Sequence, residues 1–306
     1  MLLAAIVVIT SLHSGPLKTQ FTMPSDARGP QPLIFFVGWL SCDSILYDAE
    51  HKGDGFSKFV VRTIKTSGYA TFRVDKPEPC QQLDFQSELA AYQEAFEYAI
   101  KLPQVDPSKV VIVGLSNGGG FAPLVAQGHP VAAYVSIGGW GRTWLEHMLE
   151  LERERLQLSG KTPTEVNEQL RLFPEFYVRY LVRREKPGDV IQSDARFKKI
   201  WYDAPDSQYG RPAAFFQQLQ ALDLEREWSR VRVPTLVIRG EYDWIMSRND
   251  AAAIANASHG QLMIRPRMDH FLDLHANYAN SMNDNAAHFD DALVGDVIAW
   301  LHRVVK

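Results

Sequence analysis

A serine stands between small residues at the point where a strand-like pattern gives way to a helix-like one. Gly114-Leu-Ser-Asn-Gly118 closes the apolar run Val110–Leu115 and precedes the glycine-rich start of a helix. A sharp strand-to-helix turn strains the serine backbone and requires small neighbours. It exposes the hydroxyl at the carboxyl end of a sheet, beside a helix N-terminus that favours developing negative charge. Ser116 is therefore predicted to be a nucleophile.

A serine hydroxyl becomes a strong nucleophile only when a base takes its proton, and a carboxylate must orient that base. After a strand-to-helix serine turn of this kind, the acid and then the histidine follow along the chain. The run Thr235–Ile238 leads into Arg-Gly-Glu-Tyr-Asp243, and the weaker run Gln261–Ile264 leads into a loop that contains His270. Asp243 is the predicted acid and His270 the predicted base.

Neighbouring residues offer alternatives for both roles. Glu241 lies nearer the end of its strand than Asp243 and could be the acid. His275 and His288 follow His270 closely enough to replace it as the base. Asp269 adjoins His270, but adjacent side chains point in different directions, which favours a structural role for this carboxylate.

A tetrahedral intermediate also needs two backbone N–H donors for its oxyanion. One should be the amide of Asn117, and the other should come from the loop after Leu33–Val37, where Trp39 is the chosen residue. The sequence has no phosphate-binding loop, dinucleotide fingerprint or paired-histidine zinc motif. Chemistry of this kind requires no cofactor and no metal.

Short apolar runs alternate with helix-like segments along most of the chain, which predicts a doubly wound, mostly parallel α/β sheet. The predicted strands are Leu33–Val37, Ala70–Val74, Val110–Leu115, Val131–Ile137, Thr235–Ile238 and Gln261–Ile264. The predicted helices between and after them are Phe56–Thr66, Leu83–Leu102, Gly118–Gln127, Arg248–Ala257 and Asp290–Val305.

The alternation breaks between about residues 141 and 230, a stretch with helical patterns and no convincing strand. The predicted helices there are Trp144–Leu158, Thr164–Arg184, Asp194–Trp201 and Ala213–Ala221. The stretch is rich in aromatic residues: Phe173, Phe176, Tyr177, Tyr180, Trp201, Tyr202, Tyr209, Phe215 and Phe216. These rings either form a core of their own or line a substrate pocket. Phe176, Tyr177 and Phe215 are expected to influence substrate choice.

The chain has 306 residues, 46% of them hydrophobic and 22% charged, with a formal net charge of −4. The acidic balance argues against a nucleic-acid partner, and no apolar run reaches the roughly 18 residues of a membrane span. These features predict a soluble globular protein. Met1–Thr10 is either the first part of a two-stranded hairpin, with a turn at residues 13–15, or a degraded signal sequence.

Four segments resemble the α/β-hydrolase superfamily: FFVGWL, GLSNGG, VPTLVIRGEYDWI and MDHF. Within it, the chain looks like esterases related to prolyl-oligopeptidase-type and X-Pro-peptidase-type hydrolases. The resemblance implies an eight-stranded sheet with helices on both faces, formed by residues 1–140 and 231–306, and a helical cap inserted at 141–230. One departure is Val37-Gly38, where the superfamily commonly has His-Gly in the oxyanion loop.

The expected activity is hydrolysis of a small-molecule carboxylic ester through an acyl-enzyme. Peptidase or amidase activity on a short substrate is the alternative within this mechanism, and a non-catalytic receptor that uses the pocket is the alternative outside it. The sequence does not indicate the oligomeric state.

The only two cysteines, Cys42 and Cys80, follow two strands whose loops emerge at one edge of an α/β-hydrolase sheet. Adjacent strands lie at a spacing that a disulfide can bridge, so this pair is a disulfide candidate. Two unrelated buried thiols are the alternative. A bond would favour a periplasmic or secreted protein, and its absence a cytoplasmic one.

Overall fold

The computed structural model describes residues 6–9, 17–46, 49–50, 54–283 and 287–306. Eight strands form one sheet in the order β1-β2-β4-β3-β5-β6-β9-β10. They are Ile6–Ile9, Thr19–Pro24, Ala70–Val74, Gln31–Val37, Val105–Leu115, Ala133–Ile137, Thr235–Gly240 and Gln261–Arg265, in that spatial order. Only β2 runs against its neighbours, because β1 and β4 both pair with it antiparallel and every other pairing is parallel. The predicted mostly parallel, eight-stranded sheet is confirmed.

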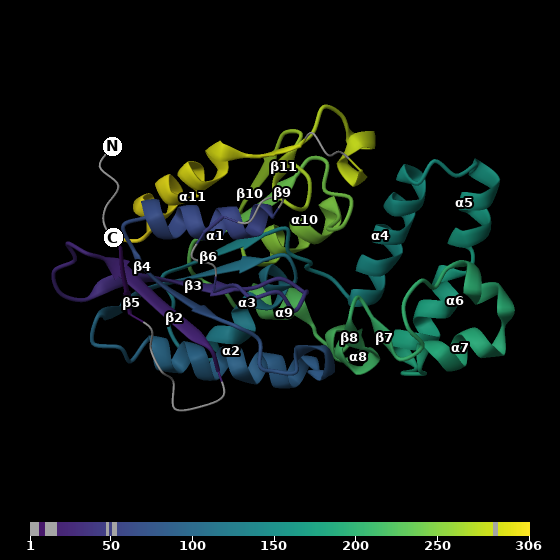
Figure 1. Ribbon diagram of the computed structural model, residues 1–306, viewed down its shortest axis with the longest axis horizontal. Coiled ribbons are helices and arrows are strands. Elements are labelled where there is room, and N and C mark those ends of the chain that lie inside the picture. Colours follow the sequence, from purple (N-terminus) through teal and green to yellow (C-terminus); the bar gives the residue numbers. More distant parts are fainter. Residues whose placement is uncertain (1–5, 10–16, 47–48, 51–53, 284–286) are drawn as a thin grey trace.

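Helices cover both faces of the sheet (Figure 1). One face carries α1 (Gly55–Thr66) and α11 (Asp291–Val304). The other carries α2 (Phe85–Ala99), α3 (Asn117–Ala126), α9 (Leu224–Ser229) and α10 (Arg248–Ala257).

The strands are apolar on both faces, which is why they read as continuous runs rather than as alternating patterns. In β3, Ile34 and Phe36 pack with the core beneath α1 and α11. Leu33, Phe35 and Val37 of the same strand pack with the core beneath α2 and α3. This double burial fixes the strand register, because a slip of one residue would exchange the two faces.

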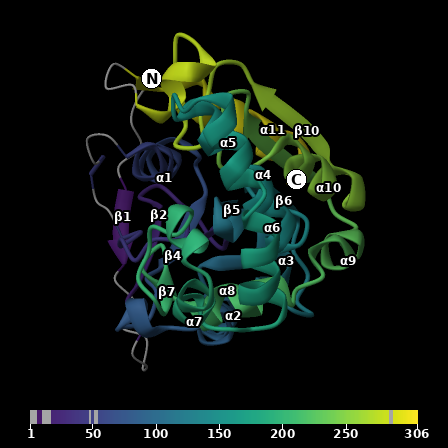
Figure 2. The ribbon, with the colours of Figure 1, turned by 90° about the vertical axis from the view of Figure 1, so that its right-hand side faces the viewer.

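Residues 141–230, here called the helical segment, connect β6 to β9. The segment contains α4 (Trp144–Leu158), α5 (Pro163–Leu170), α6 (Phe173–Tyr177), a π-helical turn (Val178–Val182), α7 (Pro187–Ser193), a 3₁₀ turn (Ala195–Lys199), α8 (Ala213–Gln220) and α9. Of this segment, α4 to α8 lie beyond one end of the sheet (Figure 1). In the view turned by 90°, α4 to α8 lie in front of the strands (Figure 2).

The predicted helix at Trp144–Leu158 is confirmed to the residue, whereas the long predicted helix Thr164–Arg184 is wrong. That stretch divides into α5, α6 and the π-helical turn, and Pro174 lies in the first turn of α6, where a proline without N–H is tolerated. A two-residue strand pair that the patterns did not predict, β7 (Ser207–Gln208) with β8 (Arg211–Pro212), follows later.

Four further short elements remain: β11 (Asp273–Leu274) pairs with β12 (His288–Phe289), and 3₁₀ turns occupy Cys80–Gln82 and Tyr278–Met282. The expected N-terminal hairpin is present as the antiparallel pair β1–β2, and its turn at residues 13–15 lies outside the described residues. In the part of the chain that the structure describes, no helix is both long and apolar enough to cross a membrane.

Candidate active site

Ser116 occupies the turn between β5 and α3 in a backbone conformation that non-glycine residues rarely adopt, with φ 53° and ψ −122°. Its N–H donates to the carbonyl oxygen of Ile137 at 2.8 Å, which ties the turn to β6. A Cβ atom on Gly114 would lie 2.4 Å from the carbonyl oxygen of Gly118. The two flanking glycines therefore allow the close approach that the turn requires.

Three polar side chains from separate loops meet at this turn. Ser116 Oγ lies 2.9 Å from His270 Nε2, and His270 Nδ1 lies 3.0 Å from Asp243 Oδ2. The other oxygen of Asp243 accepts the main-chain N–H groups of Ile245 and Met246 at 2.9 and 2.7 Å. An ionised carboxylate can only accept a hydrogen bond, so this arrangement favours the His270 tautomer that has its proton on Nδ1 and a free acceptor at Nε2. Each of the three side chains is buried, with at most 6% exposure.

The imidazole of His270 is held by packing as well as by hydrogen bonds. The ring of Phe56 meets it edge-on at 5.7 Å, and the ring of Phe271 at 5.4 Å. Gly138, with a positive φ of 60°, passes so close that a Cβ there would lie 3.1 Å from Cε1 of the histidine. These neighbours leave the ring little freedom to turn away from Ser116.

The alternative residues from the sequence take part in other contacts. Glu241 is exposed, and its carboxylate accepts the N–H of Arg267 at 2.9 Å. His275 Nε2 lies 3.0 Å from Asp269 Oδ2, and His288 is exposed in β12. Asp269 also accepts a main-chain N–H within its own loop, at Asp273, in keeping with a structural role.

The loop after β3 lies directly against the start of α3. A Cβ atom on Gly118 would be 2.4 Å from the carbonyl oxygen of Gly38. The N–H of Gly38 donates to the hydroxyl of the buried Tyr92 at 3.1 Å. Trp39 stacks on Phe56 with 5.4 Å between ring centroids. The close approach of Gly38 to Gly118 places Trp39, the residue after Gly38, near the start of α3.

A cavity of about 720 Å³ opens at Ser116. Its wall contains residues from the sheet loops and from the helical segment: Trp39, Leu40, Ser41, Asp43, Asp54, Phe56, Ser116, Asn117, Trp144, His147, Leu151, Arg155, Tyr202, Tyr209, Trp244, Ile245, Met246, His270 and Phe271.

Phe176, Tyr177 and Phe215, which are expected to influence substrate choice, do not line this cavity. All three are at most 1% exposed and pack on other aromatic rings inside the helical segment. Tyr202 and Tyr209, which belong to the same aromatic set, do line the cavity. Arg155 was missed altogether, because a Glu- and Arg-rich helix is ordinarily read as a solvated face.

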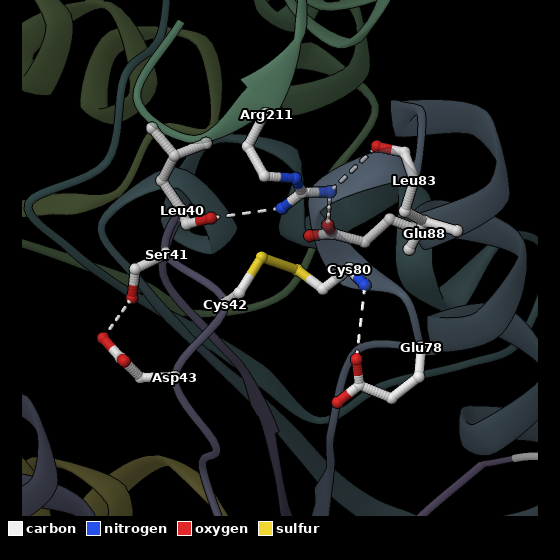
Figure 3. The surroundings of a disulfide bond; sticks show 9 residues. All are labelled: Leu40, Ser41, Cys42, Asp43, Glu78, Cys80, Leu83, Glu88 and Arg211. Carbon is white, nitrogen blue, oxygen red and sulfur yellow. Dashed lines mark hydrogen bonds and ion pairs between the residues drawn. A yellow bond between two sulfur atoms is a disulfide. The ribbon is translucent and has the colours of Figure 1, made fainter. Parts of the chain in front are cut away.

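The predicted disulfide between Cys42 and Cys80 is present, with 5.8 Å between the Cα atoms. It joins the loop after β3 to the loop after β4, and Arg211 of the helical segment lies beside it (Figure 3). The guanidinium donates to the carbonyl oxygens of Leu40 and Leu83 and forms a fully buried ion pair with Glu88 of α2.

This sheet order, with a serine at the turn after β5 and the acid and histidine loops after β9 and β10, is that of an α/β hydrolase. The family described as "alpha/beta hydrolase fold" matches residues 67–273, so the chain belongs to that family. No curated protein matches the sequence.

Solved structures support the same fold at low sequence identity. Est1E from Butyrivibrio proteoclasticus is similar with a TM-score of 0.59 and 16% identity, over 97% of this chain and 99% of that one. The esterase domain of a Rhodothermus marinus protein is similar with a TM-score of 0.56 and 18% identity, over 99% of this chain and 100% of that one.

Proposed function

We propose that the protein is a serine hydrolase that cleaves a carboxylic ester through an acyl-enzyme, with Ser116 as nucleophile, His270 as base and Asp243 as the orienting acid. The observation that carries the proposal is the hydrogen-bonded chain from Ser116 Oγ to His270 Nε2 and from Nδ1 to Asp243, at 2.9 and 3.0 Å. The esterase structures with the same fold favour an ester over other substrates.

In the first half-reaction, Ser116 Oγ forms a bond to the ester carbonyl carbon while Nε2 of His270 takes the hydroxyl proton. The carbonyl π electrons move onto oxygen, where the amides of Asn117 and Trp39 would stabilise the charge. Collapse of this intermediate breaks the bond to the alcohol oxygen, which leaves with the proton from His270. A water molecule repeats the sequence on the acyl-enzyme, releasing the acid and restoring the serine.

Asp243 contributes by fixing the imidazole rather than by taking a proton. Its second oxygen is already bound by two main-chain N–H groups, so the carboxylate is held in place before substrate arrives. We further propose that residues 141–230 form a cap whose residues complete the substrate cavity above the core of residues 1–140 and 231–306. The contribution of Trp144, Tyr202 and Tyr209 to the cavity wall supports this division.

The test is labelling by a fluorophosphonate probe together with turnover of p-nitrophenyl esters of graded chain length, alongside aminoacyl-anilides. Ser116→Ala should abolish labelling and lower ester kcat by several orders of magnitude, of order 10⁶ in a comparable triad, with an unchanged circular dichroism spectrum. Labelling that persists in Ser116→Ala would refute the nucleophile. Anilide cleavage faster than ester cleavage would replace the ester by an amide.

A further inference from the structure

Helix α4 forms part of the cavity wall, where the guanidinium of Arg155 lies against the buried carboxylate of Glu152. The side chain of Glu152 is fully buried, whereas that of Arg155, three residues later, keeps 24% exposure and lines the cavity. Nε and Nη2 of Arg155 both bind Oε2 of Glu152, at 2.7 and 2.6 Å. The ring of Tyr202 lies 5.0 Å from the guanidinium carbon. Contacts with Glu152 and Tyr202 thus hold the guanidinium in one place.

The tyrosine hydroxyl groups around this guanidinium already donate their protons to other side chains. Tyr177 and Tyr202 both donate to Oε1 of Glu152, at 3.2 and 2.8 Å. Because the proton of Tyr202 points to Glu152, the hydroxyl of Tyr209, 3.0 Å away, must donate to the oxygen of Tyr202. Glu152 therefore receives donors at both oxygens. Within the described ranges, Nη1 of Arg155 has no hydrogen-bond partner, so it remains available as a donor.

Two aromatic side chains that line the same cavity are largely exposed to solvent. Tyr202, from the helical segment, is 52% exposed, and Phe271, next to His270, is 44% exposed. Large aromatic side chains that remain open to solvent in one place commonly mark a binding surface. The rings would contact an apolar body that lies between the reacting carbonyl and Arg155.

The remaining charges on the wall favour one orientation of an anionic substrate. Asp43 and Asp54, from loops that precede α1, also line the cavity. Their carboxylates repel an anion beside these loops, whereas Arg155 attracts one beside α4. A guanidinium binds a carboxylate with paired, charge-assisted hydrogen bonds that a neutral oxygen does not match.

We propose that Arg155 is a specificity-determining residue that binds a carboxylate at the end of the substrate remote from the scissile ester. This inference rests on the proposed esterase function and names its substrate class: esters with an apolar body and a distal carboxylate. The carboxylate belongs either to the acyl half or to the alcohol half, and the experiment separates these two sources.

Two matched pairs of esters provide the test. Monomethyl hexanedioate and methyl hexanoate differ only in whether the acyl chain ends in a carboxylate or a methyl group. The acetate of ω-hydroxyhexanoic acid and hexyl acetate differ in the same way on the alcohol side. The measurement is the ratio of kcat/KM within each pair, followed by titration of released acid. We expect the carboxylate member to be preferred in one pair.

Arg155→Met should lower that preference at least about tenfold, the loss expected for a hydrogen bond to a charged group. Arg153→Met is the matched control, because Arg153 lies on the same helix, is exposed and does not line the cavity. It should leave the ratio as in the wild type. Since Arg155→Met leaves Glu152 buried without its cation, the double variant Glu152→Gln/Arg155→Met is measured as well, and it should show the same loss of preference in a folded protein.

The possible failures are distinguishable. If the wild type hydrolyses the methyl-ended esters through Ser116 but shows no preference that depends on Arg155, the inference is overturned and the esterase function stands. If the wild type hydrolyses none of the four esters and is not labelled by a fluorophosphonate, the proposed function itself fails.

Discussion

The backbone of Ser116 is strained at the turn that presents its hydroxyl group. Its φ of 53° is unfavourable for an L-amino acid by roughly 1–3 kcal/mol, a cost that the surrounding structure must offset. The offset comes from the hydrogen bonds that its N–H and carbonyl oxygen make to Ile137 and Gly119, both within 2.9 Å. As a result of this conformation, the hydroxyl group of Ser116 faces the cavity rather than the sheet.

The carboxylate behind the histidine gives a prediction at the same scale. Asp243→Asn should lower kcat by about 10⁴, because an amide in that position favours the wrong tautomer of His270. The buried main-chain contacts to Ile245 and Met246 can be kept by the amide oxygen, so the melting temperature should change little. Steady-state kinetics and thermal unfolding are the measurements.

Glu241→Gln is the control for this prediction, since Glu241 is exposed and its contact with the N–H of Arg267 survives in the amide. Its activity should stay within about twofold of the wild type. A large loss in Glu241→Gln together with near-normal Asp243→Asn would transfer the role of the acid to Glu241.

The candidate site could be read from sequence where a residue lies in the loop after a strand. Ser116 directly follows β5, Asp243 and His270 lie in the loops after β9 and β10, and parallel strands end at one edge. Arg155 and Tyr202 could not be read in this way, because their places depend on how the helical segment folds over the sheet. The same dependence explains why Tyr209 rather than Phe176 lines the cavity, although both are aromatic residues of that segment.

At the scale of elements, the β7–β8 hairpin connects the substrate cavity with the loop after β3. Its turn is Tyr209-Gly210, with φ 47° and 73°, as a two-residue turn of the type favoured in hairpins requires. Tyr209 lines the cavity, and Arg211, two residues later, donates to the carbonyl oxygen of Leu40 next to Trp39. This short hairpin, Ser207 to Pro212, therefore contacts both the substrate cavity and the loop that is proposed to supply the oxyanion donor.

We predict that Arg211→Met lowers both stability and kcat. Removing one partner of a buried ion pair typically costs roughly 3–5 kcal/mol, because Glu88 is left buried and uncompensated. The loop that contains Leu40 loses its donor, so kcat should fall more than KM rises. Urea denaturation and steady-state kinetics measure the two effects.

The double variant Glu88→Gln/Arg211→Met separates these effects. It removes the uncompensated carboxylate, but it does not restore the hydrogen bond to the carbonyl oxygen of Leu40. It should recover part of the stability while kcat stays low. Full recovery of kcat in the double variant would show that Arg211 affects the loop only through overall stability.

Asp250 of α10 connects the helical segment to the core at another place. Its carboxylate accepts from Gly141 N–H, from Arg142 and from Ser247, and lies 3.5 Å from His147 Nδ1. Burial opposes ionisation, but the neighbouring His147 and the charge of Arg142 outweigh it and lower the pKa of Asp250 below its usual range. The ionised carboxylate therefore stabilises the folded state.

The pH dependence follows from the sign of that shift. A lowered folded-state pKa gives stability that is fully present above the unfolded-state value of about 3.9 and is lost as pH falls below it. Asp250→Asn should thus be less stable than the wild type at pH 7, and the difference should shrink by about 1.4 kcal/mol per unit below pH 3.9. Urea denaturation at several pH values measures this difference. A constant difference from pH 7 to pH 3 would contradict the role of the charge.

Over the whole molecule, the sheet was the most predictable part. Strands covered on both faces leave long apolar runs, and β3, β5 and β9 carry such runs in the sequence. The packing of the helical segment was not predictable, because its contacts join distant parts of the chain: Trp228 Nε1 donates to Gly120, and Arg211 reaches Leu40. Contacts between residues more than a hundred positions apart leave no periodic pattern in the sequence.

The disulfide acts at this scale too, because it joins two loops of the core at the place where the helical segment meets them (Figure 3). A bond across a separation of 38 residues lowers the entropy of the unfolded chain by an amount worth about 4 kcal/mol. We propose that the protein works in an oxidising compartment, where such a bond persists.

The last prediction is that protein made under oxidising conditions has no titratable thiol when denatured without reductant. Cys42→Ser/Cys80→Ser should lose about 4 kcal/mol of unfolding free energy in urea. It should also lose kcat, because Cys42 is three residues from Trp39, whose amide is proposed to bind the oxyanion. Arg211 still donates to Leu40 in this variant, so the loss of kcat should be smaller than in Arg211→Met, and reductant should change the wild type but not the variant. Two titratable thiols in the untreated protein would refute the bond and, with it, the argument for an oxidising compartment.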